Sequence, residues 1–476
     1  MASACVAYAA YNASSAAPTA LLRKIDPSAI HALEGGHRAG CAMSAAGVSV
    51  AATVPGGGCT DLGVGSDETR WRQLHYLPVR HEWRQSAPAE VRRLSDQLRA
   101  ELTRLQTAGD GCGSLPLHTV AELPMIGFCA TIEYGLLALA RSASSGARLV
   151  LGHRSAPTWS SQWLCAGERS LGCYFNVSSA CCPEQSSFDI GVSEGARHAF
   201  MPGKLAMKMK RIGGARRQLY RHKQPNKATL RSAMAAHGAT AANGYEFGSS
   251  RALSLGGALE GYNIYGTLWV SGQLAHWLFG RMHPRIRSLL DARRAGVLPR
   301  LSSESTRPLC ISMHIRRGDS CSLGSRYCPS NFSATYFAAA ARLRHHYSIN
   351  TLFVATDDAN AATLCAQGHL GFDCRTARMD RVRFNARESI ERRVVRVSTG
   401  LLSGSAVAID TLADVEMLSE CDAHVLVLRS AVSRLALSLS VARKGRYPPL
   451  ISLQWPWGGL PGPMKGSVRS KRTRGS

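Results

Sequence analysis

The sequence has no long apolar run. No stretch of about 18 or more consecutive apolar residues occurs along its 476 residues, so the sequence predicts no transmembrane helix. Residues 1–22 are uncharged and rich in alanine, but Asn12 and Pro18 interrupt them. They also lack the basic start that is typical of a signal peptide, so no membrane anchor is identified in the chain.

Several nucleotide- and metal-binding motifs are also missing. There is no Gly-x-x-x-x-Gly-Lys-Ser/Thr loop, which argues against a P-loop NTPase. There is no Asp-x-Asp motif either, so no metal-bridged diphosphate is indicated. None of the 15 cysteines forms a Cys-x-x-Cys pair, which leaves zinc ribbons and thioredoxin-like chemistry with little support. Cysteines scattered at wide spacing are typical of an oxidising compartment.

Acidic residues are few. The chain has 57 Lys and Arg against 32 Asp and Glu, a net charge of +25. Such an excess indicates an anionic partner, which can be a nucleic acid, a membrane surface or a phosphorylated substrate. Part of the charge is concentrated in residues 204–231, which contain no acid. Because these residues lack the interleaved aromatics that stack bases, they favour a solvated loop over a nucleic-acid site.

Composition divides the chain into five predicted parts. Alanine, glycine and serine dominate its beginning, apolar residues at helical spacing follow, and regular helix and strand patterns come later. The parts are a disordered low-complexity segment 1–70, an amphipathic helical segment 71–110, an N-terminal α/β domain 111–299 with the basic loop 204–231, a Rossmann-like domain 300–464 and a basic tail 465–476.

Strands and helices alternate in the last third of the chain. Ile311, Met313 and Ile315 alternate with polar residues, which is strand periodicity. A helix follows, with Ser333 as its predicted N-cap. This β-α-β alternation predicts a parallel, doubly wound sheet in an α/β protein. The predicted strands are 309–315, 351–356, 405–409 and 423–428, and the predicted helices are 333–347, 411–420 and one that opens at Ser430.

Charged and hydroxyl residues follow these strands. In open α/β sheets ligands bind beyond the carboxyl ends of the strands, so these residues are expected to meet at one rim. Two adjacent arginines suit a phosphate-rich ligand, and the start of a helix can offer backbone N–H groups to an anion. Solvated arginines at a strand end are the plainer alternative. The candidate site residues are His314, Arg316, Arg317, Asp319, Asp357, Asp358, Asp410 and Ser430.

Three of these stretches resemble the motifs of one family. His314-Ile-Arg-Arg-Gly-Asp319, Val354-Ala-Thr-Asp-Asp358 and Asp410 through Arg434 resemble the motifs of GDP-fucose-dependent fucosyltransferases. The resemblance is to the eukaryotic alpha-1,6-fucosyltransferase that modifies N-glycan cores, and to the rhizobial chitin-oligosaccharide fucosyltransferase. It covers roughly residues 88–460.

The resemblance implies a GT-B-like fold with two α/β domains and a metal-independent, inverting transfer without a cofactor. It implies GDP-fucose as the donor and a glycan or glycoprotein as the acceptor, with an alpha-1,6 linkage to N-acetylglucosamine of N-glycans. It further implies a membrane anchor and a place in the Golgi or secretory pathway. Carried over to this chain, Arg316 and Asp319 are the catalytic candidates, and the donor is expected to contact His314, Arg316, Arg317, Asp357, Asp358, Asp410 and Ser430.

The chain departs from the family at informative positions. Ser320 and Gly324 stand where the family has a lysine and the glutamate that is its presumed base, so the base must be another residue, with Asp319 as one candidate. Arg429 replaces a small hydroxyl residue, and the family's C-terminal SH3-like domain has no counterpart here. By analogy with the family, Cys112 is expected to pair with a cysteine of residues 173–182.

Two other functions remain open. The loss of the family's lysine and glutamate motivates a non-catalytic relative that binds a nucleotide sugar or a glycan. The net charge of +25 motivates a nucleic-acid-binding protein, although no nucleic-acid partner is expected on the leading interpretation.

Overall fold

The computed structural model divides the chain into two units, 1–66 and 67–476, and all residues that it describes lie in the second. Within them, no helix is both long enough and apolar enough to cross a membrane. The predicted segment 1–70, most of the basic loop and the basic tail fall outside this part, so the predictions about them stay predictions. The described residues are 72–78, 89–107, 115–120, 123, 126–152, 155–165, 168–177, 188–190, 209–211, 259, 262, 266–298, 309–322, 328–329, 331–379, 381, 384, 389–396 and 403–455.

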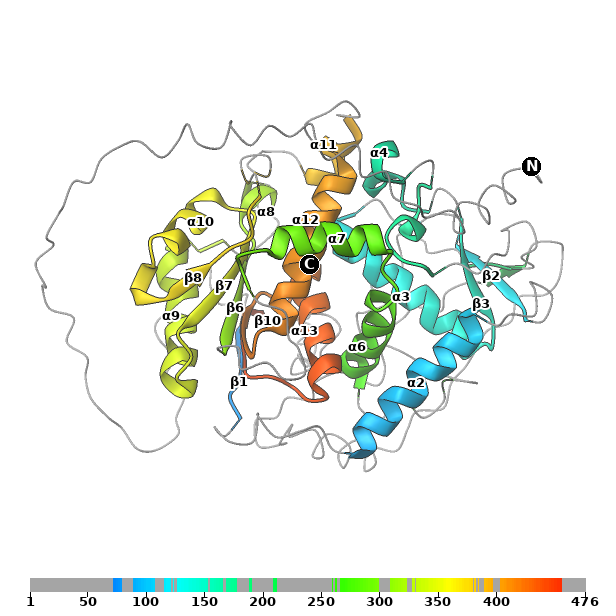
Figure 1. The fold of residues 1–476 in the computed structure, drawn as a ribbon, viewed down its shortest axis with the longest axis horizontal. Coiled ribbons are helices and arrows are strands. Elements are labelled where there is room, and N and C mark those ends of the chain that lie inside the picture. The colour runs from blue at the N-terminus through cyan, green and yellow to red at the C-terminus, as the bar shows by residue number, and fades with distance from the viewer. Residues whose placement is uncertain are drawn as a thin grey trace, which may run out of the picture. The chain divides into compact units, whose positions relative to one another are not determined.

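The larger sheet has six strands in the order β1-β10-β9-β6-β7-β8 (Figure 1). β10, β9, β6, β7 and β8 are parallel, and β1 pairs antiparallel with β10 at the edge. The chain moves outward from β6 to β7 and β8 on one side, and then to β9 and β10 on the other. The strands are β1 Arg72–Tyr76, β6 Cys310–Ile315, β7 Thr351–Thr356, β8 Asp373–Arg375, β9 Ala423–Leu426 and β10 Leu450–Trp455.

Helices cover both faces of this sheet (Figure 1). The side chains of β6 explain this arrangement. Alternate ones point to opposite faces of the sheet and pack into two different layers. Ile311, Met313 and Ile315 pack with α9 in one apolar cluster, as their alternation predicts. Ser312 and His314 face the other way and bond to His424 of β9 and Ser433 of α13. The covering helices are α9 Phe332–Tyr347 and α10 Ala359–Ala366 on one face, and α12 Gly404–Glu420 and α13 Ala431–Lys444 on the other.

A second sheet has four strands in the order β3-β2-β4-β5. β2 is parallel to β3 and β4, and β5 pairs antiparallel with β4. The long helices α2 and α3 pack against it. The elements are α2 Ala89–Thr107, β2 Leu117–Val120, α3 Phe128–Ser144, β3 Arg148–Leu151, β4 Phe188–Ile190 and β5 Met209–Arg211.

Two helices from the middle of the chain pack against the helices that cover the larger sheet, and one of them also packs against those of the second sheet. α6 Gly266–Phe279 packs against α13, α2 and α3, and α7 Pro284–Arg294 packs against α12. The contact between α6 and α13 is close, because a Cβ atom on Gly272 would collide with the carbonyl oxygen of Ser438. One apolar cluster therefore runs from α2 and α3 through α6 to α12 and α13. The domain boundary predicted at residue 299 stays a prediction.

The remaining elements are short. They are η5 Pro157–Trp159, α4 Gln162–Cys165, η6 Leu171–Cys173, α8 Gly318–Ser322, η12 His369–Gly371 and α11 Ile390–Arg396.

The predicted α/β fold class, with a C-terminal doubly wound parallel sheet, is confirmed. The predicted strand 405–409 is wrong, because these residues belong to α12, one continuous helix. Its start is capped by Ser403, whose hydroxyl accepts the N–H of Ala406. The cap of α9 is Asn331 rather than Ser333, since the Asn331 side chain accepts the N–H of Ala334 at 3.1 Å. The pairing of β1 with β10 was not predicted.

Four disulfides lie in the described part of the chain: Cys165–Cys173, Cys310–Cys421, Cys321–Cys328 and Cys365–Cys374. Cys173 therefore pairs with Cys165 rather than with Cys112, which corrects the expected pairing for that cysteine. Cys112 and the other cysteines of residues 173–182 lie outside the described residues. Cys129 is a free, buried thiol.

Candidate functional site

A pocket of about 430 Å³ opens where the order of the larger sheet reverses. The loops that follow β6 and β9 leave this reversal in opposite directions, which is where ligands bind in open α/β sheets. The volume suits a small organic ligand. Both layers line it: Ile126, Gly127, Phe128, Cys129, Ala130, Glu133, Tyr134 and Trp159 on one side, and His314, Arg316, Thr356, Asp357, Met379, Phe384, Ile390, Glu391, Val407, Asp410, Thr411, Asp414, Arg429, Ser430, Ala431, Val432 and Arg434 on the other.

Arg316 is the cation at the centre of the turn that follows β6. Its guanidinium forms ion pairs with Asp319 and Asp357, and the side chain is 20% exposed in the pocket. Asp357 also accepts the backbone N–H groups of Arg317 and Gly318 at 2.7 and 3.0 Å. A Cβ atom on Gly318 would lie 2.7 Å from the Asp357 carboxylate, so this tight turn requires glycine. The turn and its carboxylates thus hold Arg316 in one position before any ligand binds.

Arg317 turns away from the pocket. Its guanidinium pairs with Asp358 at 2.9 Å, donates to the carbonyl of Pro329 at 3.0 Å and stacks over the ring of Phe332. Asp358 in turn caps α10. Neither residue lines the pocket. Their contacts attach the turn to α9 and α10 and leave Arg316 as the member of the pair that faces a ligand.

Asp319 is enclosed rather than exposed to the pocket. One carboxylate oxygen takes the ion pair from Arg316, and the other accepts the N–H of Ile390 at 2.8 Å. The residue is 4% exposed and does not line the pocket. With both oxygens occupied, Asp319 orients Arg316 and anchors the start of α11. It is not placed to take a proton from a bound substrate, so the catalytic role expected for it is not supported.

His314 and the start of α13 form one wall. His314, 4% exposed, places Nδ1 2.7 Å from the hydroxyl of Ser433, which also accepts the N–H of Val427 at 3.1 Å. Ser430 precedes α13, and its side chain makes no capping hydrogen bond. Ala431 and Val432, the first residues of this 14-residue helix, also line the pocket. Backbone N–H groups at such a helix start favour an anion.

Arg434 and Glu133 join the two sides of the pocket. Arg434, in the second turn of α13, pairs with Glu133 of α3 through two contacts of 2.9 and 2.5 Å. Burial raises the pKa of Glu133, and the Arg434 charge opposes this shift. Two parallel N–H···O bonds fix the relative orientation of the partners. The pair therefore sets α3 against α13 behind the pocket.

α12 contributes two carboxylates one turn apart. Asp410 is 2% exposed and pairs with Arg293 of α7 at 2.7 Å. Asp414 is also buried, and its Oδ1 atom has no hydrogen-bond partner. Burial raises the pKa of Asp414 to about 7, and the charge of Arg381 works in the opposite direction. A buried carboxylate with an unused oxygen that lines a pocket is a candidate ligand contact.

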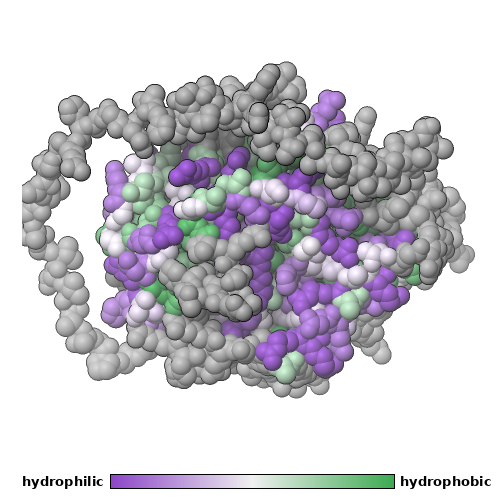
Figure 2. All heavy atoms as spheres, in the orientation of Figure 1, coloured by the Kyte–Doolittle hydropathy of each residue, from purple (hydrophilic) through white to green (hydrophobic). Residues whose placement is uncertain are grey.

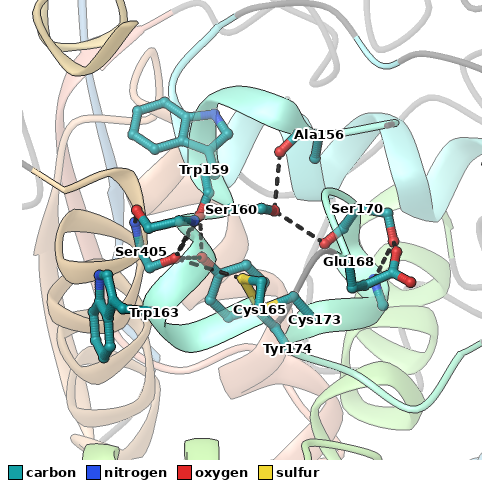
Figure 3. Close-up of a disulfide and its surroundings, with 12 residues drawn as sticks. Ala156, Trp159, Ser160, Trp163, Cys165, Glu168, Ser170, Cys173, Tyr174 and Ser405 are labelled. Carbon is teal, nitrogen blue, oxygen red and sulfur yellow. Dashed lines mark hydrogen bonds between the residues drawn. A yellow bond between two sulfur atoms is a disulfide. The ribbon is translucent and has the colours of Figure 1, made fainter. Parts of the chain in front are cut away.

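Trp159 lines the pocket from the segment just before the Cys165–Cys173 disulfide, and Figure 3 shows it close to this bond. Trp159 donates its indole N–H to the carbonyl of Ile126 at 2.9 Å, and its own carbonyl accepts from Ser405 at 3.3 Å. Ser405 also accepts the N–H of Ser161 at 2.7 Å. The segment 159–161 is thus attached to the start of α12 and positions an aromatic face beside the ligand space.

Comparisons with known proteins find similarity at the level of structure only. No protein-family model matches the chain, and no curated protein matches its sequence. A crystal structure of the NodZ alpha-1,6-fucosyltransferase soaked with GDP-fucose is 12% identical, with 68% of this chain and 92% of that chain covered and a TM-score of 0.33. The fucosyltransferase NodZ from Bradyrhizobium is 11% identical, with 67% and 92% covered and a TM-score of 0.35. Similarity at this level assigns neither a family nor a function to the chain.

Five of the eight candidate residues line the pocket, namely His314, Arg316, Asp357, Asp410 and Ser430. Sequence reasoning missed Asp414 and Glu391. A signal for Asp414 was present, because it follows Asp410 by four residues and shares its helix face. The predicted strand over 405–409 hid this spacing. No sequence pattern marked Glu391, which reaches the pocket only through the packing of α11.

No group of three or more His, Cys, Asp or Glu side chains with metal-site geometry occurs among the residues that the structure describes. On the face shown in Figure 2, hydrophilic residues cover most of the described surface and hydrophobic ones occupy small areas.

Proposed function

We propose that the chain binds a nucleoside diphosphate sugar in this pocket and transfers the sugar to an acceptor, as a glycosyltransferase. One observation carries the proposal: Arg316, the start of α13 and the carboxylate of Asp414 line the same pocket at the reversal of the sheet. A cation and a helix start suit a diphosphate, and a buried carboxylate suits the N–H groups of a base. The resemblance of the three motifs to fucosyltransferases supports GDP-fucose as the donor.

Guanine is the base that this carboxylate suits best. Its Watson–Crick edge carries adjacent N–H donors, and an ionised carboxylate is acceptor-only. Asp414 has an unused buried oxygen that could accept from that edge. Cytosine, uracil and adenine do not present two adjacent donors there. The Asp414 carboxylate therefore favours a guanine nucleotide over a uridine or adenine nucleotide.

The same groups would assist departure of the nucleotide. When the bond between the sugar and the diphosphate breaks, negative charge develops on the leaving phosphate. Arg316 is fixed by Asp319 and Asp357, and the N–H groups at the start of α13 are fixed by the helix. Preorganised positive groups stabilise such developing charge without reorganisation. We propose an inverting transfer in which these groups, rather than a metal ion, neutralise the leaving group.

The acceptor and the compartment are also proposals. The motif resemblance supports a glycan acceptor, with the alpha-1,6 linkage to N-acetylglucosamine of N-glycans as the specific case. Four disulfides in the described residues favour an oxidising environment. Together these features support a place in the secretory pathway, including the Golgi.

A second candidate is a nucleotide-sugar-binding protein without transferase activity. Ser320 stands in the position of the family's lysine, and its hydroxyl points at Asp319 at 3.4 Å. Gly324 stands in the position of the family's glutamate. In this case GDP would bind normally, and neither transfer nor hydrolysis of GDP-fucose would be observed.

The donor site is tested by binding measurements on the Arg316→Ala variant. Calorimetry with GDP in the presence of EDTA should show binding to the parent chain, and at least a tenfold weaker affinity in the variant, because a charge-assisted contact to a phosphate is lost. Arg342→Ala removes an exposed arginine on α9 and serves as the matched control. Arg316→Lys keeps a positive charge next to Asp319 and Asp357. It therefore serves as a control for a loss of GDP binding that is caused by unfolding of the protein. Equal GDP affinity in Arg316→Ala and the parent would refute the assignment.

A further inference from the structure

Glu391 presents a carboxylate to the pocket from the first turn of α11. Its side chain is partly exposed. Among the described residues, no cation or hydrogen-bond donor is paired with this carboxylate. It therefore differs from Asp357, Asp410 and Glu133, which are paired with arginines, and what it does there is not explained by donor binding.

The position of Glu391 is fixed from two sides. The preceding residue, Ile390, donates its N–H to Asp319, which also holds Arg316. On the opposite side, a Cβ atom on Gly127 would lie 3.3 Å from Glu391 Oε1. The missing side chain at Gly127 thus leaves the space that the carboxylate occupies, next to the start of α3. Glu391 is thus held near the Arg316 cluster, and no residue in the described part of the chain neutralises it.

The other pocket carboxylates are engaged. Asp357 binds Arg316 and two backbone N–H groups. Asp410 binds Arg293, and Glu133 binds Arg434. Asp414 is the remaining rival, but it is 8% exposed and lies on α12, at the side of the pocket where we place the nucleotide base. Among the acids that the structure describes around the pocket, Glu391 is the one that combines solvent access with the lack of a paired cation from a described residue.

We infer that Glu391 is the general base of the proposed transfer. The inference rests on the proposed function, and it supplies the base that the family's glutamate would have provided at position 324. Glu391 takes the proton from the acceptor hydroxyl as that oxygen attacks the anomeric carbon of the sugar. The bond from this carbon to the diphosphate breaks, and the nucleoside diphosphate leaves with the electron pair beside Arg316. The proton then passes from Glu391 to solvent.

The apolar side of the pocket supports an acceptor at this place. Ile126, Phe128 and Trp159 face the ligand space from the layer that also holds Gly127. Aromatic faces of this kind can pack against the C–H face of a sugar ring. An acceptor bound there would place its hydroxyl between Glu391 and a donor held at Arg316. Base and leaving group would then lie on opposite sides of the reacting carbon, as inversion requires.

The test compares Glu391→Gln with the parent and with the control Glu101→Gln, which changes an α2 acid paired with Arg104. Three quantities are measured: GDP affinity, transfer from GDP-fucose to a panel of N-acetylglucosamine-terminated glycans, and release of GDP with sodium azide as the nucleophile. We expect Glu391→Gln to bind GDP within twofold of the parent and to lose about 10²–10⁴ of the transfer rate. Azide carries no proton to remove, so it should restore turnover in this variant.

Each outcome separates the base from the donor site. A parent chain that does not bind GDP refutes the proposed function itself. A parent that binds GDP and transfers fucose, with Glu391→Gln equally active, overturns the inference about the base alone. Loss of transfer that azide does not restore would indicate a structural role for Glu391 and would also overturn it. Loss of transfer in Asp414→Asn at unchanged GDP affinity would move the role of base to Asp414.

Discussion

Asp414 carries a cost to the folded protein that follows from its surroundings. Burial raises its pKa from the ordinary value of 3.8 to about 7. Between these two values the unfolded chain has released the proton, whereas the folded chain still holds it. The free energy of unfolding therefore falls as the pH rises through this window, and the loss is complete above pH 7. A buried carboxylate retained under this penalty is consistent with a role in binding.

Replacement of Asp414 by asparagine should remove this cost. We expect the Asp414→Asn variant to gain about 1–3 kcal/mol in the free energy of unfolding at pH 8 and to approach the parent near pH 3, where the acid is largely protonated in both states. Chemical denaturation at the two pH values measures this. GDP affinity should fall in the variant, and in the parent it should rise between pH 6 and 8. Asp96→Asn, at an exposed acid, is the control, and an equal gain in that variant would contradict the explanation.

The start of α12 packs very closely against the backbone of another segment near the site. Gly404, its first residue, lies against the backbone of Thr158, and a Cβ atom there would collide with the Thr158 carbonyl oxygen. The hydroxyls of Ser403 and Ser161 lie 2.6 Å apart beside this contact. The indole N–H of Trp163 donates to Ser403 at 2.8 Å. Figure 3 shows Ser405 of this helix beside Trp159 and Ser160.

The methyl group added in the Gly404→Ala variant should therefore push residues 158–163 away from α12. We expect a loss of about 1–3 kcal/mol in the free energy of unfolding, because a backbone carbonyl cannot rotate out of the way as a side chain can. Binding of GDP or of the sugar should weaken too, since Trp159 would move with these residues. Gly135→Ala in α3 is the matched control, because the added methyl group would meet only the Leu171 side chain, at 2.8 Å. Urea denaturation of both variants gives the comparison, and equal losses would contradict the close-contact explanation.

The sequence predicted some elements well and others not at all. β6 and β7 were predicted because alternating or β-branched apolar runs bounded by charge are typical of buried strands. The run 405–409 is short and apolar, and such a run is compatible with either a buried strand or a helix. Its cap at Ser403 could have decided the question. The collision that excludes a side chain at Gly404 depends on Thr158, which lies far away in the sequence.

The candidate site shows the same limit. Because ligands bind beyond the carboxyl ends of parallel strands, His314, Arg316 and Asp357 were predicted to lie together. All three line the pocket. It could not separate Arg316 from Arg317, because the directions of two adjacent side chains depend on the backbone of the turn. It also could not show that the carboxylate of Asp319 is occupied by the N–H of Ile390, 71 residues later. The location of the site at the strand ends was predictable, whereas the residues from α3 and α11 and the individual roles required the fold.

At the scale of the whole molecule, the Cys310–Cys421 bond closes the longest loop among the described disulfides. Its cysteines lie 111 residues apart, at the start of β6 and just after α12. The enclosed segment carries Arg316, Asp357, Glu391 and Asp414. A bond of this span restricts the unfolded chain more than a short one. It therefore stabilises a part of the fold that supplies nearly half of the residues lining the pocket.

Removal of this bond should be more costly than removal of a local one. We expect the double variant Cys310→Ser and Cys421→Ser to lose about 5 kcal/mol in the free energy of unfolding, from the loop entropy. The Cys365–Cys374 pair, nine residues apart, should lose about 3 kcal/mol when treated in the same way. Denaturant titration of both double variants measures the difference. Losses in the reverse order would indicate that the native contacts, rather than the loop length, determine the effect.

β1 has a consequence for the solubility of shortened forms of the chain. This strand lies before residue 88, outside the stretch with the family motifs. It nevertheless pairs with β10, the last strand of the larger sheet along the chain. Without it, β10 would present a row of unpaired N–H and C=O groups on a strand with buried Leu450, Ile451 and Leu453. Exposed apolar edges of this kind pair with other chains and promote aggregation. The N-terminal strand thus acts as a cover that keeps one molecule from adding its sheet to the next.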